Sequence, residues 1–224
     1  MEAFLDNSDA VLEGFSWTVR LTAISALFSF LLGIVLTAMR VSPVPLLRLM
    51  ATVYVEAIRN TPLTLVLLFC GLGLNSALGL SFAESVEWNV YWLAVLGLSA
   101  YTACFVSEAL RAGINTIPFG QIEAARSLGL TFMQNMRLIV LPQALRAVIG
   151  PLGSVLIALT KNTTVASVAG LGVQEASRQM KLMFDQGVVP VVPTFVGFAL
   201  GFLVLCLPMG WIFGRLSKRL AVAR

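Results

Sequence analysis

The chain has 224 residues, of which 58% are hydrophobic and only 12% are charged, with a mean hydropathy of +0.90. Soluble domains carry about 25% charged residues, so this composition excludes a soluble globular protein and a disordered one. Long apolar runs argue against an outer-membrane β-barrel, in which apolar and polar residues alternate. The sequence has no histidine, which removes the usual general base and the commonest metal ligand. The net charge is +4. In a membrane protein the positions of the basic residues along the chain indicate its orientation.

Uncharged stretches predict the membrane spans. A bilayer core of about 30 Å needs about 20 apolar residues in a helix. Uncharged gaps of 19, 24, 20 and 29 residues follow Arg20, Arg59, Glu87 and Asp185. A further long apolar segment, after Arg146, contains Lys161. We therefore expect an all-α integral membrane protein, a single transmembrane domain over 1–224, with about five transmembrane helices: 16–39, 61–80, 89–110, 144–171 and 189–213.

The basic residues predict the orientation. The first fifteen residues carry four acids and no base, the reverse of a signal peptide, so the first helix is expected to be a true span. Connections on one side of the predicted spans, together with the C-terminal tail, hold eleven Lys and Arg, and the other side holds two. Because cytoplasmic loops carry the excess of Lys and Arg, the N-terminus is expected outside and the C-terminus in the cytoplasm.

Few side chains suit catalysis or metal binding. Cys70, Cys104 and Cys206 stand inside apolar runs without the spacing of a metal motif, so we interpret them as small buried hydrophobes and expect no metal site. Two similar segments, with Glu56 before Arg59 and Glu108 before Arg111, stand at the predicted cytoplasmic edge. Their i,i+3 spacing allows each Glu to pair with its own Arg. Structural pairing is one interpretation, and a cytoplasmic gate or subunit contact is the other.

The connection between the third and fourth spans, about 114–143, has structure of its own. Pro118 and Gly120 follow the third span, and a short helix fits 121–128. Gly129 suits a helix end that needs a positive φ, and Thr131 with Gln134 has the spacing of a capping box. A helix this short is marginal alone in water. It is expected either to lie on lipid headgroups or to dock on a partner protein.

This loop resembles the EAA loop of permease subunits of ATP-binding-cassette (ABC) importers. The matching residues, at the family's spacing, are Glu123, Ala124, Ala125, Gly129, Ile139, Leu141 and Pro142. Segments 54–63, 120–125, 141–144 and 161–164 are similar to permeases for polar amino acids, and the resemblance covers about 14–215. The sequence departs from that pattern at Thr164 and Val165, where Ser and Leu are more common, and at Arg20, where an uncharged residue is usual.

The resemblance implies a type I ABC importer permease in a bacterial cytoplasmic membrane, in contact with the lipid bilayer and without a nucleic-acid partner. It implies a second permease subunit, identical or paralogous, two cytoplasmic ATPase subunits and an extracytoplasmic amino-acid-binding protein. None of the three lysines has the sequence context of a P-loop, so this chain is expected to be no enzyme, and ATP and Mg belong to the partner. The residues assigned to ATPase coupling are Gln121, Glu123, Ala124, Ala125, Gly129, Leu141 and Pro142.

The candidate substrate pathway contains Arg20 and the run Lys161, Asn162, Thr163 and Thr164. A lysine deep in a span costs about 2.5–3.5 kcal/mol, so Lys161 is expected to face the protein interior or a watery cavity. Two cations without an intramembrane acid favour an acidic or polar amino acid, glutamate first, or a glutamine-like solute. The alternatives are snorkelling of Arg20 to headgroups, and an internal ion pair or helix-break anchor at Lys161.

Two other function classes compete with the importer. A membrane-embedded enzyme needs a nucleophile with a base or a metal, and neither constellation is present in the sequence. A passive channel leaves the docking helix unexplained. Co-purification with an ATPase separates the importer from both alternatives.

Overall fold

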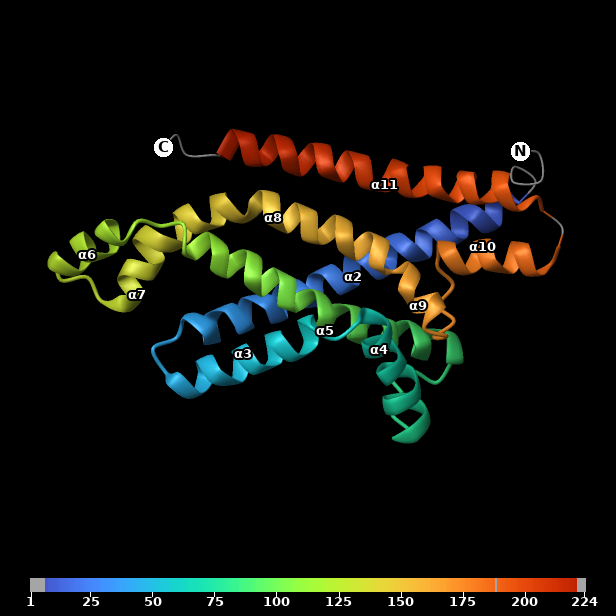
Figure 1. The fold of residues 1–224 in the computed structure, drawn as a ribbon, viewed down its shortest axis with the longest axis horizontal. Helices are drawn as coiled ribbons and strands as arrows, with labels where there is room; N and C mark the ends of the chain where they lie inside the picture. The colour runs from blue at the N-terminus through green and yellow to red at the C-terminus, as the bar shows by residue number, and fades with distance from the viewer. Residues whose placement is uncertain (1–6, 188, 221–224) are drawn as a thin grey trace.

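The computed structural model describes residues 7–187 and 189–220, and this part of the chain is helical without a strand (Figure 1). The elements, in chain order, are α2 (Ser8–Val41), α3 (Pro45–Arg59), α4 (Leu63–Leu68), η1 (Phe69–Ala77), α5 (Val86–Ile114), α6 (Phe119–Ser127), α7 (Phe132–Asn135), η2 (Met136–Val140), α8 (Leu141–Asn162), α9 (Thr164–Val168), α10 (Ala176–Asp185) and α11 (Val191–Leu220). The wider, π-type turns η1 and η2 continue neighbouring α-helical segments.

Four helical stretches among the described residues are long and apolar enough to cross a membrane: α2, α5, the continuous run Phe132–Val168, and α11. The pair α3 and Leu63–Ala77 also qualifies if it is one span bent by 102°. The expected all-α membrane architecture is therefore confirmed, with four or five candidate spans among the described residues where about five were expected.

The second predicted span, 61–80, differs from the structure. Pro62 precedes α4 with φ −57° and ψ 134°, so the chain turns there instead of continuing from α3. The segment Leu63–Ala77 is short for a bilayer on its own. The fourth predicted span, 144–171, ends its α8 part at Asn162 and continues as α9. The helices α3 and α10 were not predicted as separate elements.

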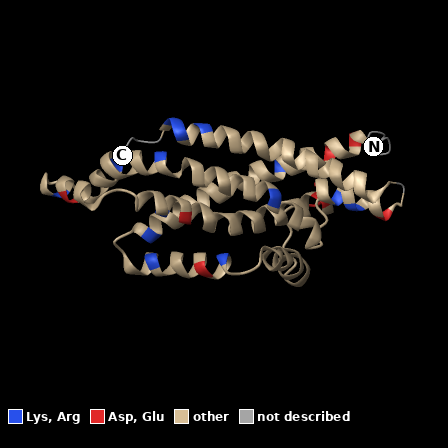
Figure 2. Cartoon of the chain, turned by 45° about the horizontal axis from the view of Figure 1, so that its top comes forward, with Lys and Arg blue, Asp and Glu red and all other residues tan. Residues whose placement is uncertain are grey.

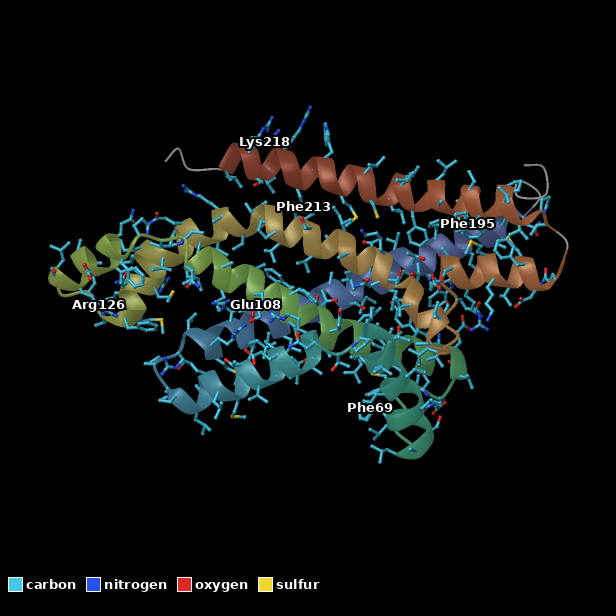
Figure 3. The ribbon with its side chains drawn as sticks, viewed as in Figure 1. Phe69, Glu108, Arg126, Phe195, Phe213 and Lys218 are labelled. Atoms are coloured by element: carbon cyan, nitrogen blue, oxygen red, sulfur yellow. The ribbon has the colours of Figure 1, made fainter. Side chains whose placement is uncertain are left out.

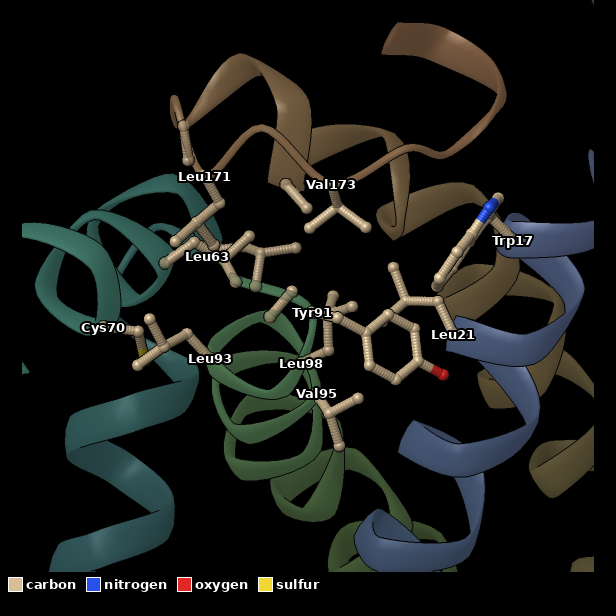
Figure 4. Close-up of a cluster of buried hydrophobic side chains, with 14 of the residues drawn as sticks. Trp17, Leu21, Leu63, Cys70, Tyr91, Leu93, Val95, Leu98, Leu171 and Val173 are labelled. Carbon is tan, nitrogen blue, oxygen red and sulfur yellow. The ribbon is translucent and has the colours of Figure 1, made fainter. Parts of the chain in front are cut away.

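The main hydrophobic core lies where α2, α4, α5 and α9 meet (Figure 4). Leu21, Tyr91, Leu98 and Val173 are buried in it. Small residues let α2 and α5 approach closely, because a Cβ on Gly33 would lie 2.5 Å from the Val106 side chain. Cys70 and Cys104 are buried and free, as predicted, while Cys206 is half-buried.

The periphery of the chain is apolar. Helix α11 lies along one side of the molecule next to α8 and α10 (Figure 1), and large hydrophobic side chains are exposed along its whole length. Exposed apolar side chains on a spanning helix face lipid or another membrane subunit. The loop helices α6 and α7 lie at the same end of the long axis as the end of α11, and α10 lies at the opposite end with the start of α2 (Figure 1).

Candidate functional site

The end of α6 is a fully formed Schellman motif, built on Gly129. The Gly129 N–H donates to the Arg126 carbonyl at 2.9 Å, and the Leu130 N–H donates to the Ala125 carbonyl at 3.1 Å. Gly129 has φ +80°, a conformation that side chains with a Cβ adopt at a cost. The chain therefore reverses sharply after α6, as the sequence predicted.

The second half of the loop is held by a capping box and a cross-link. The Gln134 N–H donates to the Thr131 hydroxyl at 3.3 Å, and the Thr131 N–H donates to the Gln134 side chain at 2.9 Å. The buried Asn135 amide donates to the Ile122 carbonyl at 3.2 Å and ties α7 to α6. These contacts make α6 and α7 one compact hairpin that projects from the bundle (Figure 1).

The hairpin presents an apolar surface. Phe119 is 80% exposed and Leu128 is 83% exposed, and Glu123 and Ala124 are exposed between them in the sequence. Ala125 is instead buried against its own chain, so its small side chain serves packing within the hairpin and is not open to a partner. Glu123 and Arg126, three residues apart on α6, form no ion pair within the described part of the chain.

The loop is linked to α8. Gln121 accepts a hydrogen bond of 2.8 Å from the Gln143 side chain of α8, whose amide also donates to the Ile139 carbonyl at 3.0 Å. Leu141 and Pro142 are exposed at the start of α8. The hairpin is continuous with the helical run Phe132–Val168, which contains Lys161.

The predicted edge pairs form only in part. Arg111 donates from Nε and Nη2 to one oxygen of Glu108, at 3.2 and 2.8 Å. The other oxygen pairs with Arg40 at 2.6 Å and with Arg59 at 3.4 Å. The predicted pair of Glu56 with Arg59 is absent: within residues 7–187 and 189–220 Glu56 has no ion pair and points outward. Glu108 thus joins α2, α3 and α5 (Figure 3).

The two candidate pathway cations are exposed on the single chain. The Arg20 guanidinium lies 5.5 Å from the centroid of the Trp17 ring, a cation–π contact. Lys161 is exposed near the end of α8 and has no ion pair with any described residue, so an internal ion pair does not explain it. The nearby open groove of about 830 Å³ between α8 and α11 is lined by apolar residues such as Ile157, Leu207 and Trp211.

The hydroxyls of Thr163 and Thr164 form hydrogen bonds with backbone carbonyls of the same helical run. Thr163 is buried and donates to the Thr160 carbonyl at 2.8 Å, and Thr164 donates to the Lys161 carbonyl at 2.8 Å. Such bonds to a preceding carbonyl bend helices, and α8 ends at Asn162. Asn162 is half-buried and its side chain forms no hydrogen bond with the described residues.

A buried carboxylate next to this run was missed from the sequence. Glu175 is 0% exposed and caps α10, accepting hydrogen bonds from the N–H groups of Ser177 at 2.8 Å and Arg178 at 3.1 Å. The hydroxyls of Ser167, on α9, and Ser177 also donate to it. The Ser177 hydroxyl lies 3.3 Å from the Thr164 carbonyl as well. Glu175 therefore fastens α10 to the segment that follows Lys161.

The chain matches a known family and several similar proteins. The family model described as "Binding-protein-dependent transport system inner membrane component" matches residues 23–222. The chain is similar to the glutamate transport system permease protein GluC of Corynebacterium glutamicum, with 52% identity over 98% of this chain and 97% of the relative. It is also similar to the probable glutamine ABC transporter permease protein GlnM of Bacillus subtilis, with 36% identity over 96% and 95% of the two chains.

Solved structures show the same fold. A chain from the crystal structure of an amino acid ABC transporter with histidines superposes with a TM-score of 0.86 at 26% identity, covering 96% of both chains. A chain from an inward-facing methionine transporter, MetNI, gives a TM-score of 0.75 at 20% identity, over 95% of this chain and 96% of the other.

Proposed function

Because the chain belongs to the family of binding-protein-dependent transport system inner membrane components, we propose that it is the permease subunit of an ATP-driven amino-acid importer, with glutamate as the substrate. The assignment of glutamate as the substrate is supported mainly by the 52% identity to a glutamate permease over nearly the full length of both chains. Two exposed cations in apolar spans, Arg20 and Lys161, support an anionic solute, because charges of the same sign repel a cation strongly in a low-dielectric passage.

The partner ATPase drives transport through its contact with the α6–α7 hairpin. Its exposed Phe119, Glu123 and Leu128 form the surface offered to a cytoplasmic ATPase, and the Schellman turn at Gly129 fixes the direction of α6. Gln121 is hydrogen-bonded to Gln143 of α8, and Leu141 and Pro142 at the start of α8 are assigned to the same coupling region. ATP and Mg bind to that partner, and this chain needs no cofactor of its own. The chain acts as a transport subunit without catalytic residues.

The pathway lies between two permease subunits, this chain and an identical or paralogous one, with an extracytoplasmic binding protein delivering the amino acid. Exposure of Lys161 on the single chain supports a pathway completed by a second subunit, since an unpaired lysine facing lipid is unfavourable. The N-terminus is outside and the C-terminus cytoplasmic. Figure 2 supports this orientation: Lys and Arg gather at the end of α11 and along α3, on the half of the chain that carries α6 and α7.

The direct test is uptake by vesicles that contain this chain, its ATPase, its binding protein and, if required, a second permease. We expect ATP-dependent accumulation of glutamate and competition by unlabelled glutamate. Accumulation of arginine without glutamate overturns the substrate assignment. Glutamate flux without ATP hydrolysis overturns the importer in favour of a channel.

A further inference from the structure

One face of α6 is open to a partner. Phe119, Glu123 and Arg126 stand at the spacing i, i+4 and i+7, which places them on one side of a helix, and all three are exposed. The opposite side carries Ala125, which is buried, and Ile122, whose carbonyl is hydrogen-bonded to α7. The packing of α6 on α7 therefore leaves the first three residues facing away from the hairpin.

The Arg126 guanidinium has no partner among the described residues. It forms neither an ion pair nor a side-chain hydrogen bond with them, although Glu123 stands only three residues earlier on the same face. A guanidinium has five N–H donors and keeps its charge in proteins. The donors of Arg126 are therefore available to an acceptor on another molecule.

The surroundings of Arg126 are short of acids. Glu123 is the only acidic residue in the segment 109–174, whereas the loop and the start of α8 also carry Arg137 and Arg146. Both of these arginines are exposed and have no ion pair with a described residue. The hairpin and the start of α8 thus present a net positive charge, which favours a partner surface that contains carboxylates.

The position of Arg126 favours a protein over lipid headgroups as the partner. Helix α11 runs along the long axis of the molecule, with Lys218 in its last turn. Arg126 lies farther out along this axis than Lys218 (Figure 3). Basic residues at the end of a spanning helix lie near the membrane surface, so Arg126 projects past that level into the aqueous phase, where the proposed ATPase lies.

We infer that Arg126 pairs with a carboxylate of the ATPase, next to an apolar pocket that receives Phe119. The inference rests on the proposed ATPase contact and adds the chemistry of the partner surface, an aspartate or glutamate beside apolar side chains. An arginine binds a carboxylate through two parallel hydrogen bonds, which gives the contact a defined geometry. Such a pair also disfavours a wrong partner, because the arginine is then left without its counter-charge.

The first test is carbodiimide cross-linking of the assembled permease–ATPase complex. The reagent joins a lysine amine and a carboxylate in contact as an amide, and takes up the water that is lost. The chain has only three lysines, all outside the hairpin, so Arg126→Lys introduces a single new amine there. We expect a cross-link from position 126 to an aspartate or glutamate of the ATPase, located by mass spectrometry. The matched control is Arg48→Lys on α3, an exposed position without an ion pair to a described residue, which should form none.

The second test is the affinity of the permease in phosphatidylcholine nanodiscs for its purified ATPase, at low and high salt. Arg126→Gln should weaken binding about tenfold at low salt, and binding should become less sensitive to salt because a screened ion pair is lost. Phe119→Ala should weaken binding to the same extent at both salt concentrations, since the contact of Phe119 is apolar. Arg48→Gln removes the same charge elsewhere and should bind as the wild type does.

Two results overturn the inference: an assembled Arg126→Lys complex without a cross-link from position 126, and an Arg126→Gln variant with the affinity and salt sensitivity of the wild type. An effect of Arg126→Gln that arises only in nanodiscs containing phosphatidylglycerol would overturn it too, and would assign Arg126 to lipid headgroups. The proposed function fails separately. If Phe119→Ala and Gly129→Val also bind the ATPase as the wild type does, the hairpin is not the ATPase contact, whereas loss of binding in these two variants alone removes only the ion pair of Arg126.

Discussion

The Gln143 side chain on α8 and the Gln121 side chain on α6 are joined by a hydrogen bond of 2.8 Å. This bond connects α6 directly to the helical run Phe132–Val168, which contains Lys161. Gln121 is exposed, so the bond contributes little to folding, about 0.5–1.5 kcal/mol. If the hairpin is the ATPase contact, the bond is expected to keep α6 and α8 together during transport.

We therefore expect Gln143→Leu to reduce the amount of glutamate taken up per ATP hydrolysed, with normal assembly of the complex. Gln121→Leu should have the same effect, and the double variant should be no worse than either single variant, because all three lack the same contact. Coupled uptake and phosphate release in proteoliposomes measure the ratio. Additive losses in the double variant would show that the two side chains act separately.

Gly129 is expected to be essential for its backbone conformation. A Cβ at this position meets nothing within 4 Å, so a substitution acts through φ +80° alone. Left-handed backbone costs about 1–2 kcal/mol for a residue with a Cβ, and more for a β-branched one. Gly129→Val should reorient α6 and uncouple transport while membrane insertion persists.

Two matched variants isolate the cause. Gly120→Ala also adds a Cβ into open space, but without a positive φ, and should transport normally. Gly129→Asn should retain more activity than Gly129→Val, since Asn tolerates the left-handed region. Uptake by Gly129→Val at the wild-type rate would refute the role of this turn in coupling.

Glu175 is expected to determine the stability of the α9–α10 region. Glu175→Ala leaves the Ser177 and Arg178 N–H groups without their acceptor in a buried site. An unsatisfied buried donor costs about 1–3 kcal/mol. The thermal unfolding midpoint of the solubilised complex should fall, whereas Glu56→Ala, which removes an exposed carboxylate without an ion pair among the described residues, should leave it unchanged. Equal midpoints for the two variants would show that the cap is dispensable.

The orientation has its own test. A fluorescent protein that matures only in the cytoplasm, fused after the C-terminus, should be bright. An alkaline phosphatase at the same position should be inactive, because that enzyme requires export. The eleven-to-two distribution of Lys and Arg in the sequence is the basis for this expectation. A bright fusion combined with an active phosphatase fusion would indicate mixed topology, and an active phosphatase alone would reverse the orientation.

Local signals in the sequence predicted the hairpin well. Positive φ at Gly129 and the capping box of Thr131 with Gln134 each depend on residues close in the chain, and the structure contains both. Charge-free length likewise predicted α2, α5 and α11, because the bilayer imposes a minimum apolar length.

Contacts between distant segments could not be predicted. Arg59 pairs with Glu108, 49 positions away, and not with Glu56 three residues before it, because packing of α3 against α5 decides which carboxylate is nearest. Glu175 stands between Gln174 and Ala176 in the sequence, and its complete burial follows only from the docking of α10 on α9 and α2. Its Ser167 partner, eight residues earlier, gives no sequence signal of its own.

The last prediction concerns the two cations assigned to the solute. Neither Arg20 nor Lys161 has an ion pair among the described residues, and both are exposed on the single chain. If they attract the glutamate carboxylates, Lys161→Met and Arg20→Leu should each slow glutamate uptake strongly, while Lys161→Arg, which keeps the charge, should retain much of the rate. The Lys181→Met variant, which removes an exposed lysine on α10, is the matched control and should behave as the wild type.

Uptake must be compared with assembly and with substrate preference. Each variant is purified with its ATPase, and ATP hydrolysis stimulated by the loaded binding protein is measured beside glutamate and glutamine uptake. A charge in the pathway should matter more for the anionic glutamate than for the neutral glutamine, because the attraction acts on the extra carboxylate. An equal loss for both amino acids would assign Lys161 and Arg20 to structure, and unchanged rates and preference in assembled Lys161→Met and Arg20→Leu complexes would remove both residues from the pathway.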